Sequence, residues 1–458
     1  MSSGWLTLAE YGEKSRCPGA IQLSRGPTPS NLELLSDKKF QALQYILLEQ
    51  GIKIQRTILG QVTAILKNPI LDTHVHGRGG RVDGYRGDIL MDLAQEHFTK
   101  HIDGLLYMPN TAGSLLTDAK GNEIDSQFPK WHIVTVEQYM RYRDLLNETD
   151  ENARKHIITV SLTADLTIET LKKLKDEPDF WGVKYYPAGA TTNSEHGNID
   201  IDLEDPRIAY MAKHRIPFHI HPETSIILWS DGLPIQGLAS NAEREFINTL
   251  RALRMKYPNL PIVIEHISTW EAAQLMEERH KNIYATVTSQ HLLLCEGDVN
   301  TGGGVLLHNG VCRPTVKGSE DLGAIQKLVL SGNPNVMMGT DSAPHFDQMP
   351  AEIRQKYGIS KSIKETGCCA NGVVSSPDVV RMMWQFFEEN GRLEHFAGFM
   401  GCNAIKAFPE IWADTKVTTK VLKNSVSTIS QQLVLPGDER FSITPMLAGT
   451  KVRWSHAA

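Results

Sequence analysis

From residue 70 onward, short apolar runs alternate with longer amphipathic stretches along the chain. Each run is short enough for a strand, and Gly, Pro or polar residues follow it before the next helical pattern begins. The runs that we predict to be strands are Ile70–His76, Gly104–Met108, Ile157–Thr163, Gly182–Tyr186, Pro217–His221, Pro261–His266, Tyr284–Thr288 and Val336–Thr340. Helical patterns lie between several of them, at residues 88–101, 167–176, 241–256, 270–280 and 319–331. Eight strands alternating with helices predict an α/β fold, a (β/α)8 barrel of the TIM type.

The two ends of the chain depart from this pattern. Residues 17–30 are rich in Gly, Pro and Ser, and residues 38–50 predict an amphipathic helix that ends at Gly51. We therefore predict an N-terminal extension, residues 1–65, that packs on a barrel domain, residues 66–458. The stretch after Asp341 is longer than one βα loop needs, so it predicts C-terminal helical additions.

Composition and charge narrow the class of protein. A length of 458 residues fits one elaborated barrel, and a net charge of −6 gives no basic surface for nucleic acid. No apolar run approaches the roughly 18 residues that span a bilayer, and the N-terminus shows no secretory signal. The six cysteines lack CxxC spacing, which favours free thiols. We expect a soluble cytoplasmic enzyme with neither nucleic acid nor membrane as a partner.

Histidine and aspartate gather at the ends of the predicted strands. The residues are His74 and His76 on the first strand, His219 and His221 on the fifth, His266 on the sixth and Asp341 on the eighth. Residues two apart in a strand face the same side, and functional groups of this fold gather at the C-terminal ends of its strands. Imidazole nitrogens and carboxylate oxygens suit Zn²⁺. The pattern predicts a metal site at the barrel mouth, although alternation does not choose between His219 and His221.

Lys184, within the fourth predicted strand, adds a cation to the same region. As an ammonium group it would be repelled by metal ions and costly to bury. A salt bridge to a carboxylate such as Asp341 is one resolution of this conflict. Carbamylation by CO₂, which turns the amine into an anionic ligand, is the other, and the residues alone leave both open.

Several segments together carry a family resemblance. They are His74-Val-His76 with Arg78, Met108-Pro-Asn110, Lys184–Ser194 with His196-Gly197, His221-Pro-Glu223, Glu265–Thr269, Thr288-Ser-Gln-His291, Gly339–His345 and Leu447–Ser455. They resemble the amidohydrolase superfamily and, within it, the single-function bacterial-type dihydroorotases. The resemblance runs from about residue 65 to the end and leaves the N-terminal extension outside it.

The resemblance implies two Zn²⁺ ions per chain. His74, His76 and Asp341 would bind one ion, and His221 and His266 the other. Carbamylated Lys184 would bridge both ions together with a hydroxide. The family pattern of a His two residues before a Glu selects His221 over His219, which is then structural. Asp341 would also act as the general base and acid.

The resemblance also implies a substrate and the residues that bind it. Arg78, Asn110 and His345 would grip the substrate carboxylate, and Thr191 and Thr192 would belong to a mobile loop that closes over it. Arg313 stands where the family has a Leu whose backbone contacts substrate, so it joins the predicted substrate-binding residues. The implied reaction is the reversible cyclisation of N-carbamoyl-L-aspartate to L-dihydroorotate in de novo pyrimidine biosynthesis, catalysed by a homodimer.

Some positions differ from the family pattern, and two alternatives stay open. Gly77-Arg78-Gly79-Gly80 precedes Arg81 where the family has Leu-Arg-Asp-Gly, and Lys364–Gly372 only partly matches a substrate loop. One alternative is an amidohydrolase for another cyclic amide, such as a hydantoin or imide, which would not need the carboxylate grip. The other is a non-catalytic relative, which should have lost metal ligands that this chain keeps.

Overall fold

The computed structural model describes residues 30–79, 81–82, 85–86, 88–111, 114–116, 132–150, 154–188, 200–224, 241–299, 312–345 and 372–457. Thr191 and Thr192, predicted to form part of a closing loop, lie outside these ranges.

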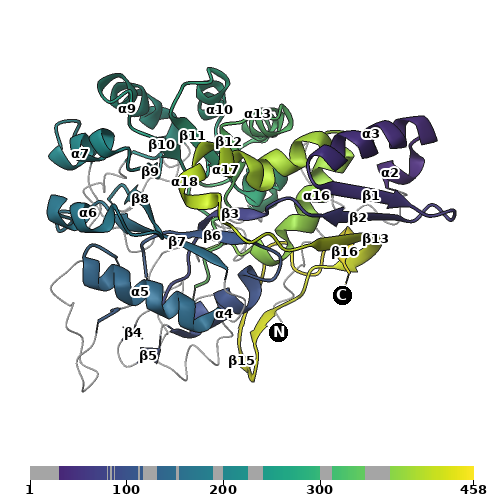
Figure 1. Ribbon diagram of the computed structural model, residues 1–458, viewed down its shortest axis with the longest axis horizontal. Helices are drawn as coiled ribbons and strands as arrows, with labels where there is room; N and C mark the ends of the chain where they lie inside the picture. The colour runs from purple at the N-terminus through teal and green to yellow at the C-terminus, as the bar shows by residue number, and fades with distance from the viewer. Residues whose placement is uncertain are drawn as a thin grey trace.

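Eight parallel strands form the central barrel, in the order β12-β11-β10-β9-β8-β7-β6-β3 (Figure 1). Their bounds are β3 Leu71–Val75, β6 Gly104–Tyr107, β7 Lys155–Ser161, β8 Phe180–Tyr185, β9 Phe218–Ile220, β10 Ile262–Ile264, β11 Ile283–Val287 and β12 Val336–Met338. Each coincides with a predicted strand, so the predicted barrel is confirmed. The first and last strands meet just beyond β12, where the Asp341 N–H donates to the His74 carbonyl at 2.8 Å and the His76 N–H donates to the Ser342 carbonyl at 3.0 Å.

Helices follow the barrel strands and surround them. They are α4 Asp88–Phe98, α5 Val136–Thr149, α6 Ile168–Leu174, α7 Pro206–His214, α9 Ala242–Lys256, α10 Trp270–Glu277, α11 Ser289–Leu293, α12 Glu296–Val299 and α13 Ser319–Leu330. Threonine hydroxyls cap the N-termini of α5, α6, α10 and α11 by accepting a backbone N–H in the first turn. Such caps satisfy otherwise unpaired donors, so they fix where each helix begins after its strand.

The predicted C-terminal helices follow the barrel. They are a 3₁₀ turn η2 Ser376–Asp378, α16 Val379–Glu389, a 3₁₀ turn η3 Leu393–His395, a π-helical turn η4 Gly398–Cys402, α17 Asn403–Ala407 and α18 Pro409–Trp412. Trp412, Phe408 and Ile411 pack against residues of the barrel strands, including Leu71. A Cβ added to Gly104, the first residue of β6, would lie 2.7 Å from the Trp412 ring. Helices α17 and α18 therefore close the N-terminal end of the barrel and leave its C-terminal end for function.

A second sheet joins the two ends of the chain, and the sequence did not predict it. β1 Ile52–Arg56 and β2 Val62–Leu66 form a hairpin, and β2 pairs with β13 Lys420–Thr428, which pairs with β16 Lys451–His456. In Figure 1 the purple N-terminal strands and the yellow C-terminal strands lie side by side. Short helices α2 Asn31–Leu34 and α3 Asp37–Glu49 precede the hairpin, and two smaller pairs are β4 Arg81–Val82 with β5 Tyr85–Arg86, and β14 Leu433–Leu435 with β15 Asp438–Ile443. The proposed domain boundary after residue 65 thus falls within β2.

Two further observations bear on the chain as a whole. None of the helices in the described part of the chain is long and apolar enough to cross a bilayer.

Cys312 and Cys402 are free thiols, as predicted. The prediction is wrong for Cys295, which is disulfide-bonded. Spacing along the chain did not reveal this pairing because the fold, not local sequence, brings disulfide partners together.

Candidate active site

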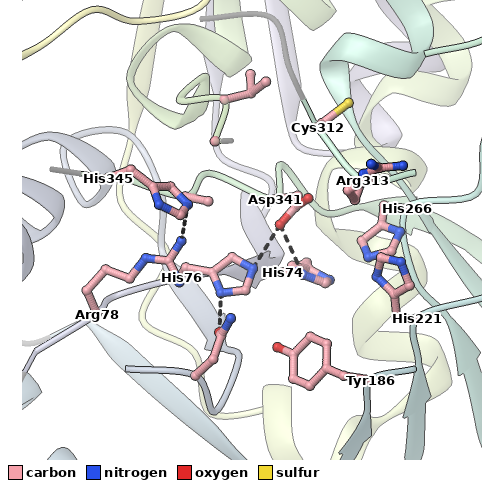
Figure 2. A pocket seen from close by; sticks show the side chains of 14 residues that line it. His74, His76, Arg78, Tyr186, His221, His266, Cys312, Arg313, Asp341 and His345 are labelled. Carbon is pink, nitrogen blue, oxygen red and sulfur yellow. Dashed lines mark hydrogen bonds and ion pairs between the residues drawn. The ribbon is translucent and has the colours of Figure 1, made fainter. Parts of the chain in front are cut away.

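A pocket at the C-terminal end of the barrel collects most of the predicted site residues (Figure 2). It is lined by nine of them: His74, His76, Arg78, Asn110, His221, His266, Arg313, Asp341 and His345. Tyr186, which follows β8, also lines it. Lys184 is fully buried, and its Nζ lies 5.1 Å from the centre of the Tyr186 ring. The fold therefore brings residues from six barrel strands to one place.

His74, His76 and Asp341 form a group whose geometry suits a metal ion. One ligand atom from each residue lies within 4.8 Å of the others. Oδ1 of Asp341 is 2.9 Å from Nε2 of His76 and 3.3 Å from Nε2 of His74. A Cβ added to Gly339 would lie 2.8 Å from Cβ of His74, so a glycine is needed there for β12 to approach β3 this closely.

Three residues of the pocket adopt the left-handed backbone conformation that side chains disfavour. The φ angles are 63° at Arg78, 41° at His266 and 52° at Asp341. Each residue lies just beyond the end of its barrel strand. Such conformations cluster at functional sites, because the surrounding structure must hold them in place. Here they turn the three side chains toward the pocket, just beyond the point at which each strand ends.

His221 and His266 form the neighbouring part of the site. Their ring centres are 4.7 Å apart, and the His266 ring is 5.0 Å from the His74 ring. His219, two residues before His221, uses both of its ring nitrogens elsewhere. Its Nδ1 lies 2.7 Å from a carboxylate oxygen of Glu265 and its Nε2 lies 3.0 Å from the Trp181 carbonyl oxygen. His219 therefore has no nitrogen left for a metal ion, whereas Nδ1 of His221 bonds to no described residue.

Buried acceptors fix the orientation of three of these histidines. Nδ1 of His74 donates to Glu265 at 2.7 Å, and Nε2 of His221 donates to Glu223 at 2.7 Å. Nδ1 of His76 donates to Oδ1 of Asn110 at 2.5 Å. An acceptor held at one ring nitrogen leaves the other ring nitrogen to face a metal ion. The nitrogens so placed are Nε2 of His74 and of His76, both beside Asp341, and Nδ1 of His221.

Some buried nitrogens of this region lack a hydrogen-bond partner within the described structure. Nδ1 of His266 and Nζ of Lys184 make no hydrogen bond within the described structure. Lys184 also forms no ion pair there, so the salt bridge to Asp341 that the sequence left open is not made. Burial lowers the pKa of Lys184 to about 8, against the opposing charges of Glu265 and Asp341. A buried, unpaired amine with a lowered pKa has the properties that reaction with CO₂ requires.

The carboxylates of the site stay ionised despite their burial. Burial alone would raise the pKa of Asp341, but hydrogen bonds and charge from His74 and His76 hold it well below its usual value. Burial is likewise outweighed at Glu265, whose pKa is lowered by the charge of His74 and by hydrogen bonds from His219 and His74. Two anions thus lie on either side of His74, which suits the binding of cations.

Arg78, Asn110 and His345 form the opposite part of the pocket. Nε of Arg78 donates to the Pro344 carbonyl at 3.0 Å, and a terminal guanidinium nitrogen donates to Nε2 of His345 at 2.7 Å. Since Oδ1 of Asn110 accepts from His76, its amide NH₂ is the part left for other contacts. Donors therefore dominate this side, which suits an anionic group.

Comparisons with known proteins agree with these observations. A scan against protein-family models finds no match. The chain is 30% identical over 389 residues to a dihydroorotase from Salmonella paratyphi A, an alignment that covers 84% of this chain and 95% of the relative. A dihydroorotase from Acinetobacter baylyi is 32% identical over 285 residues, 62% of this chain and 74% of the relative. The chain belongs to the dihydroorotase family.

Solved structures extend this likeness to the fold. A dihydroorotase from Saccharomyces cerevisiae in complex with 5-fluoroorotic acid matches with a TM-score of 0.69 and 25% identity, over 86% of this chain and 98% of that one. A D-hydantoinase from Thermus matches with a TM-score of 0.57 and 13% identity, over 86% of this chain and 82% of that one. At that identity the hydantoinase shows a shared barrel alone. This chain thus shares its fold with both dihydroorotases and hydantoinases, and it is similar in sequence to the dihydroorotases as well.

Sequence reasoning missed the roles of Glu265 and Glu223 in this dihydroorotase-family site. Both carboxylates are buried and hold a histidine in place. Alternation along a strand puts Glu265 and His266 on opposite faces. Both nevertheless contact groups of the site, because β10 ends at Ile264 and the left-handed His266 breaks the alternation. A Glu directly before a predicted ligand at a strand end was the available signal.

Proposed function

We propose that this protein is a dihydroorotase that interconverts N-carbamoyl-L-aspartate and L-dihydroorotate. The observation that carries the proposal is the division of one pocket into two parts. In Figure 2, His221 and His266 lie on one side of Asp341 and Arg78 with His345 on the other, with His74 and His76 next to Asp341 between them. The first part suits hydrolysis or formation of an amide, and the second suits the carboxylate that both compounds carry.

The donor set fits two divalent ions, for which we propose Zn²⁺. His74, His76 and Asp341 would hold one ion, and His221 and His266 the other. The orientation of His74, His76 and His221, each held by an acceptor at its other ring nitrogen, supports these assignments, as does the unpaired Nδ1 of His266. The buried amine of Lys184 would be carbamylated and would bridge the two ions, which gives its unpaired Nζ a role. The metal ions would supply Lewis acidity toward the amide carbonyl and lower the pKa of a bound water.

Asp341 would move the proton. In the hydrolytic direction, water adds to the ring amide carbonyl, the carbon–nitrogen bond breaks, and the nitrogen leaves with a proton. Asp341, ionised and at the centre of the pocket, would take the proton from the water and deliver it to the leaving nitrogen. In the other direction the ureido nitrogen bonds to the side-chain carboxyl carbon and one water molecule is released.

Arg78, Asn110 and His345 would bind the carboxylate that does not react. The planar guanidinium of Arg78 is held by Pro344 and His345, so its position is set before substrate binds. The amide NH₂ of Asn110 would donate a further hydrogen bond. Thr191 and Thr192 would contribute from a loop that closes over the substrate. The homodimer implied by the resemblance and the cytoplasmic location expected from the sequence stay predictions.

A direct assay tests the proposal. Zinc-loaded protein is mixed with L-dihydroorotate, loss of the ring-amide absorbance is followed, and Asp341→Asn serves as the matched variant. We expect hydrolysis by the wild type and a loss of at least about 100-fold in the variant, because general acid–base groups contribute about 10²–10⁴-fold. Absence of turnover by wild type that holds two metal ions per chain would refute the proposal and direct the search to other cyclic amides, such as hydantoins.

A further inference from the structure

Arg313 lies in the pocket on the side away from Arg78. In Figure 2, Arg313 lies beside His266 on one side of Asp341, and Arg78 and His345 lie on the other. The pocket therefore has a guanidinium group at each end. Within the described structure, neither guanidinium forms an ion pair with a carboxylate. The hydrogen bonds of Arg78 go to Pro344 and His345.

One nitrogen of Arg313 is buried and unpaired. Its Nη1 has no hydrogen-bond partner within the described structure. Oε1 of the buried Glu223 is unpaired within the described structure as well, and no hydrogen bond joins it to Arg313 there. The Arg313 side chain as a whole is half-buried, but an N–H that is itself buried without an acceptor is costly, so this geometry is expected where a ligand provides the acceptor.

We propose that Arg313 binds the side-chain carboxylate of N-carbamoyl-L-aspartate, the carboxylate that ring closure consumes. The inference rests on the proposed function. The open-chain compound has two carboxylates and the ring compound has one, which both share. Arg78, Asn110 and His345 account for the shared one. The second must lie near the metal-ligand histidines where it reacts, and Arg313 lies beside His266 there.

This assignment makes Arg313 a specificity residue that acts on one side of the reaction. Its contact with the second carboxylate exists in the open-chain complex and has no counterpart in the bound ring. Loss of the contact should raise KM for N-carbamoyl-L-aspartate and leave kcat in that direction unchanged, as for any interaction made equally in the ground and transition states. The equilibrium constant is fixed, so kcat/KM must fall by the same factor in both directions. For dihydroorotate that fall should appear in kcat, with KM unchanged.

The test compares Arg313→Met, which keeps length and removes charge, with Arg313→Lys, which keeps charge and removes the planar fork. Arg392→Met, at an exposed site on the C-terminal helices, controls for loss of an arginine elsewhere. We expect KM for N-carbamoyl-L-aspartate to rise roughly 10- to 100-fold in Arg313→Met, the range for a hydrogen bond to a charged group. Metal content, measured on the same samples, should stay at the wild-type value. Equal changes of KM in the two directions, no change in either, or loss of metal would each overturn the assignment.

A second measurement varies the ligand and leaves the folded wild type intact. Calorimetric binding of N-carbamoyl-L-asparagine, whose side-chain amide replaces the second carboxylate, is compared with binding of N-carbamoyl-L-aspartate in wild type and in Arg313→Met. Replacing the carboxylate of the ligand and replacing Arg313 each weaken binding. If Arg313 contacts that carboxylate, the two effects are coupled, and making both changes together weakens binding by less than the sum of the two. Additive losses would refute the contact. A different outcome would separate the two proposals. If the protein binds N-carbamoyl-L-aspartate in a way that depends on Arg313 but does not convert it, the proposed function is refuted and the carboxylate site stands.

Discussion

At the scale of single residues, Glu265 determines the environment of the metal-ligand histidines. Its two oxygens accept hydrogen bonds from His74 and His219, and the Thr286 hydroxyl donates a further one at 2.7 Å. The carboxylate thus holds the His74 ring at a fixed angle and places its proton on Nδ1. Partners of this kind around a metal site orient the ligands and raise their basicity.

The variant Glu265→Gln tests this role. An amide offers one acceptor oxygen in place of two, so one of the two histidines loses its partner. We expect the zinc affinity of the apoprotein to fall roughly 10- to 100-fold. The measurement is a competitive titration against a chelating dye. Glu410→Gln, an exposed exchange on α18, is the control, and unchanged affinity in Glu265→Gln would show that Glu265 has no positioning role.

The sequence predicted which residues meet in the pocket better than it predicted how they are held. Strand-end positions placed His74, His76, His221, His266 and Asp341 together because strand geometry is regular. The partners of these residues depend on departures from that geometry, such as the left-handed His266, and on contacts between distant strands. Strand alternation left the choice between His219 and His221 open, and the family resemblance selected His221. The contacts of His219 with the Trp181 carbonyl and Glu265 support that choice.

At the scale of elements, a buried ion pair joins the second sheet to the barrel. Lys420 of β13 donates to Oδ2 of Asp103, which precedes β6, and both side chains are almost fully buried. Oδ1 of the same carboxylate accepts from the backbone N–H and hydroxyl of Thr418, and Oδ2 also accepts from the Ile70 N–H at 2.9 Å. One carboxylate therefore fixes β13 to the start of two barrel strands.

Removal of the cation should be strongly destabilising. In Lys420→Met the Asp103 carboxylate keeps its burial and loses its counter-ion, which typically costs about 3–5 kcal/mol. Urea unfolding measures the loss as a lower midpoint with an unchanged slope. Lys172→Met removes an exposed ion pair with Glu169 and should have a far smaller effect. Comparable losses in the two variants would mean that burial of the Lys420 pair has no special importance.

Stacked histidines at the same junction should make stability depend on pH. The rings of His101 and His456 are 3.4 Å apart and nearly parallel. Burial, with the charges of Lys420 and Lys100, lowers the pKa of His101 to about 4, and burial with the charge of His101 lowers that of His456 to about 3. An unfolded histidine has a pKa near 6.5, so the unfolded chain binds more protons between these values and stability falls as the pH decreases from about 6.5 to 3. Above pH 6.5 the pair contributes no such dependence.

The matched variant is His456→Phe, which keeps an aromatic ring and removes one titrating group. The free energy of unfolding, measured by urea at several pH values, should decline less steeply between about pH 6.5 and pH 4 than in the wild type. An unchanged slope would show that other groups dominate acid sensitivity.

The second sheet shows why local pattern did not give the whole fold. β1 has the alternating burial expected of a strand with one face on a core, and residues 62–66 alternate similarly. The hairpin was nevertheless assigned to an appended segment, because its partner strand lies near the other end of the chain. Pairing between remote strands depends on register and packing that no local window contains.

At the scale of the whole molecule, these contacts should make unfolding cooperative. The N-terminal hairpin pairs with β13, β13 is fixed to the barrel by Asp103, and α17 and α18 close the barrel's far end. We therefore expect one calorimetric transition for the metal-free protein, with equal calorimetric and van't Hoff enthalpies. A chain shortened to begin at Lys67 lacks β1 and β2 and should unfold at a lower temperature. Two separate transitions in the full chain, or an unchanged midpoint in the shortened one, would support residues 1–65 as an independent extension.

The union of both chain ends in one sheet has a consequence for synthesis. A ribosome makes β1 and β2 before the eight barrel strands and makes β13 and β16 only after them. Until then, the edge of β2 that receives β13 has no partner, and such unpaired edges make partly made chains prone to aggregate. A ribosome that stalls before β13 would therefore release a chain with most of its barrel strands but no completed second sheet. That product should depend on chaperones more than the full-length chain does.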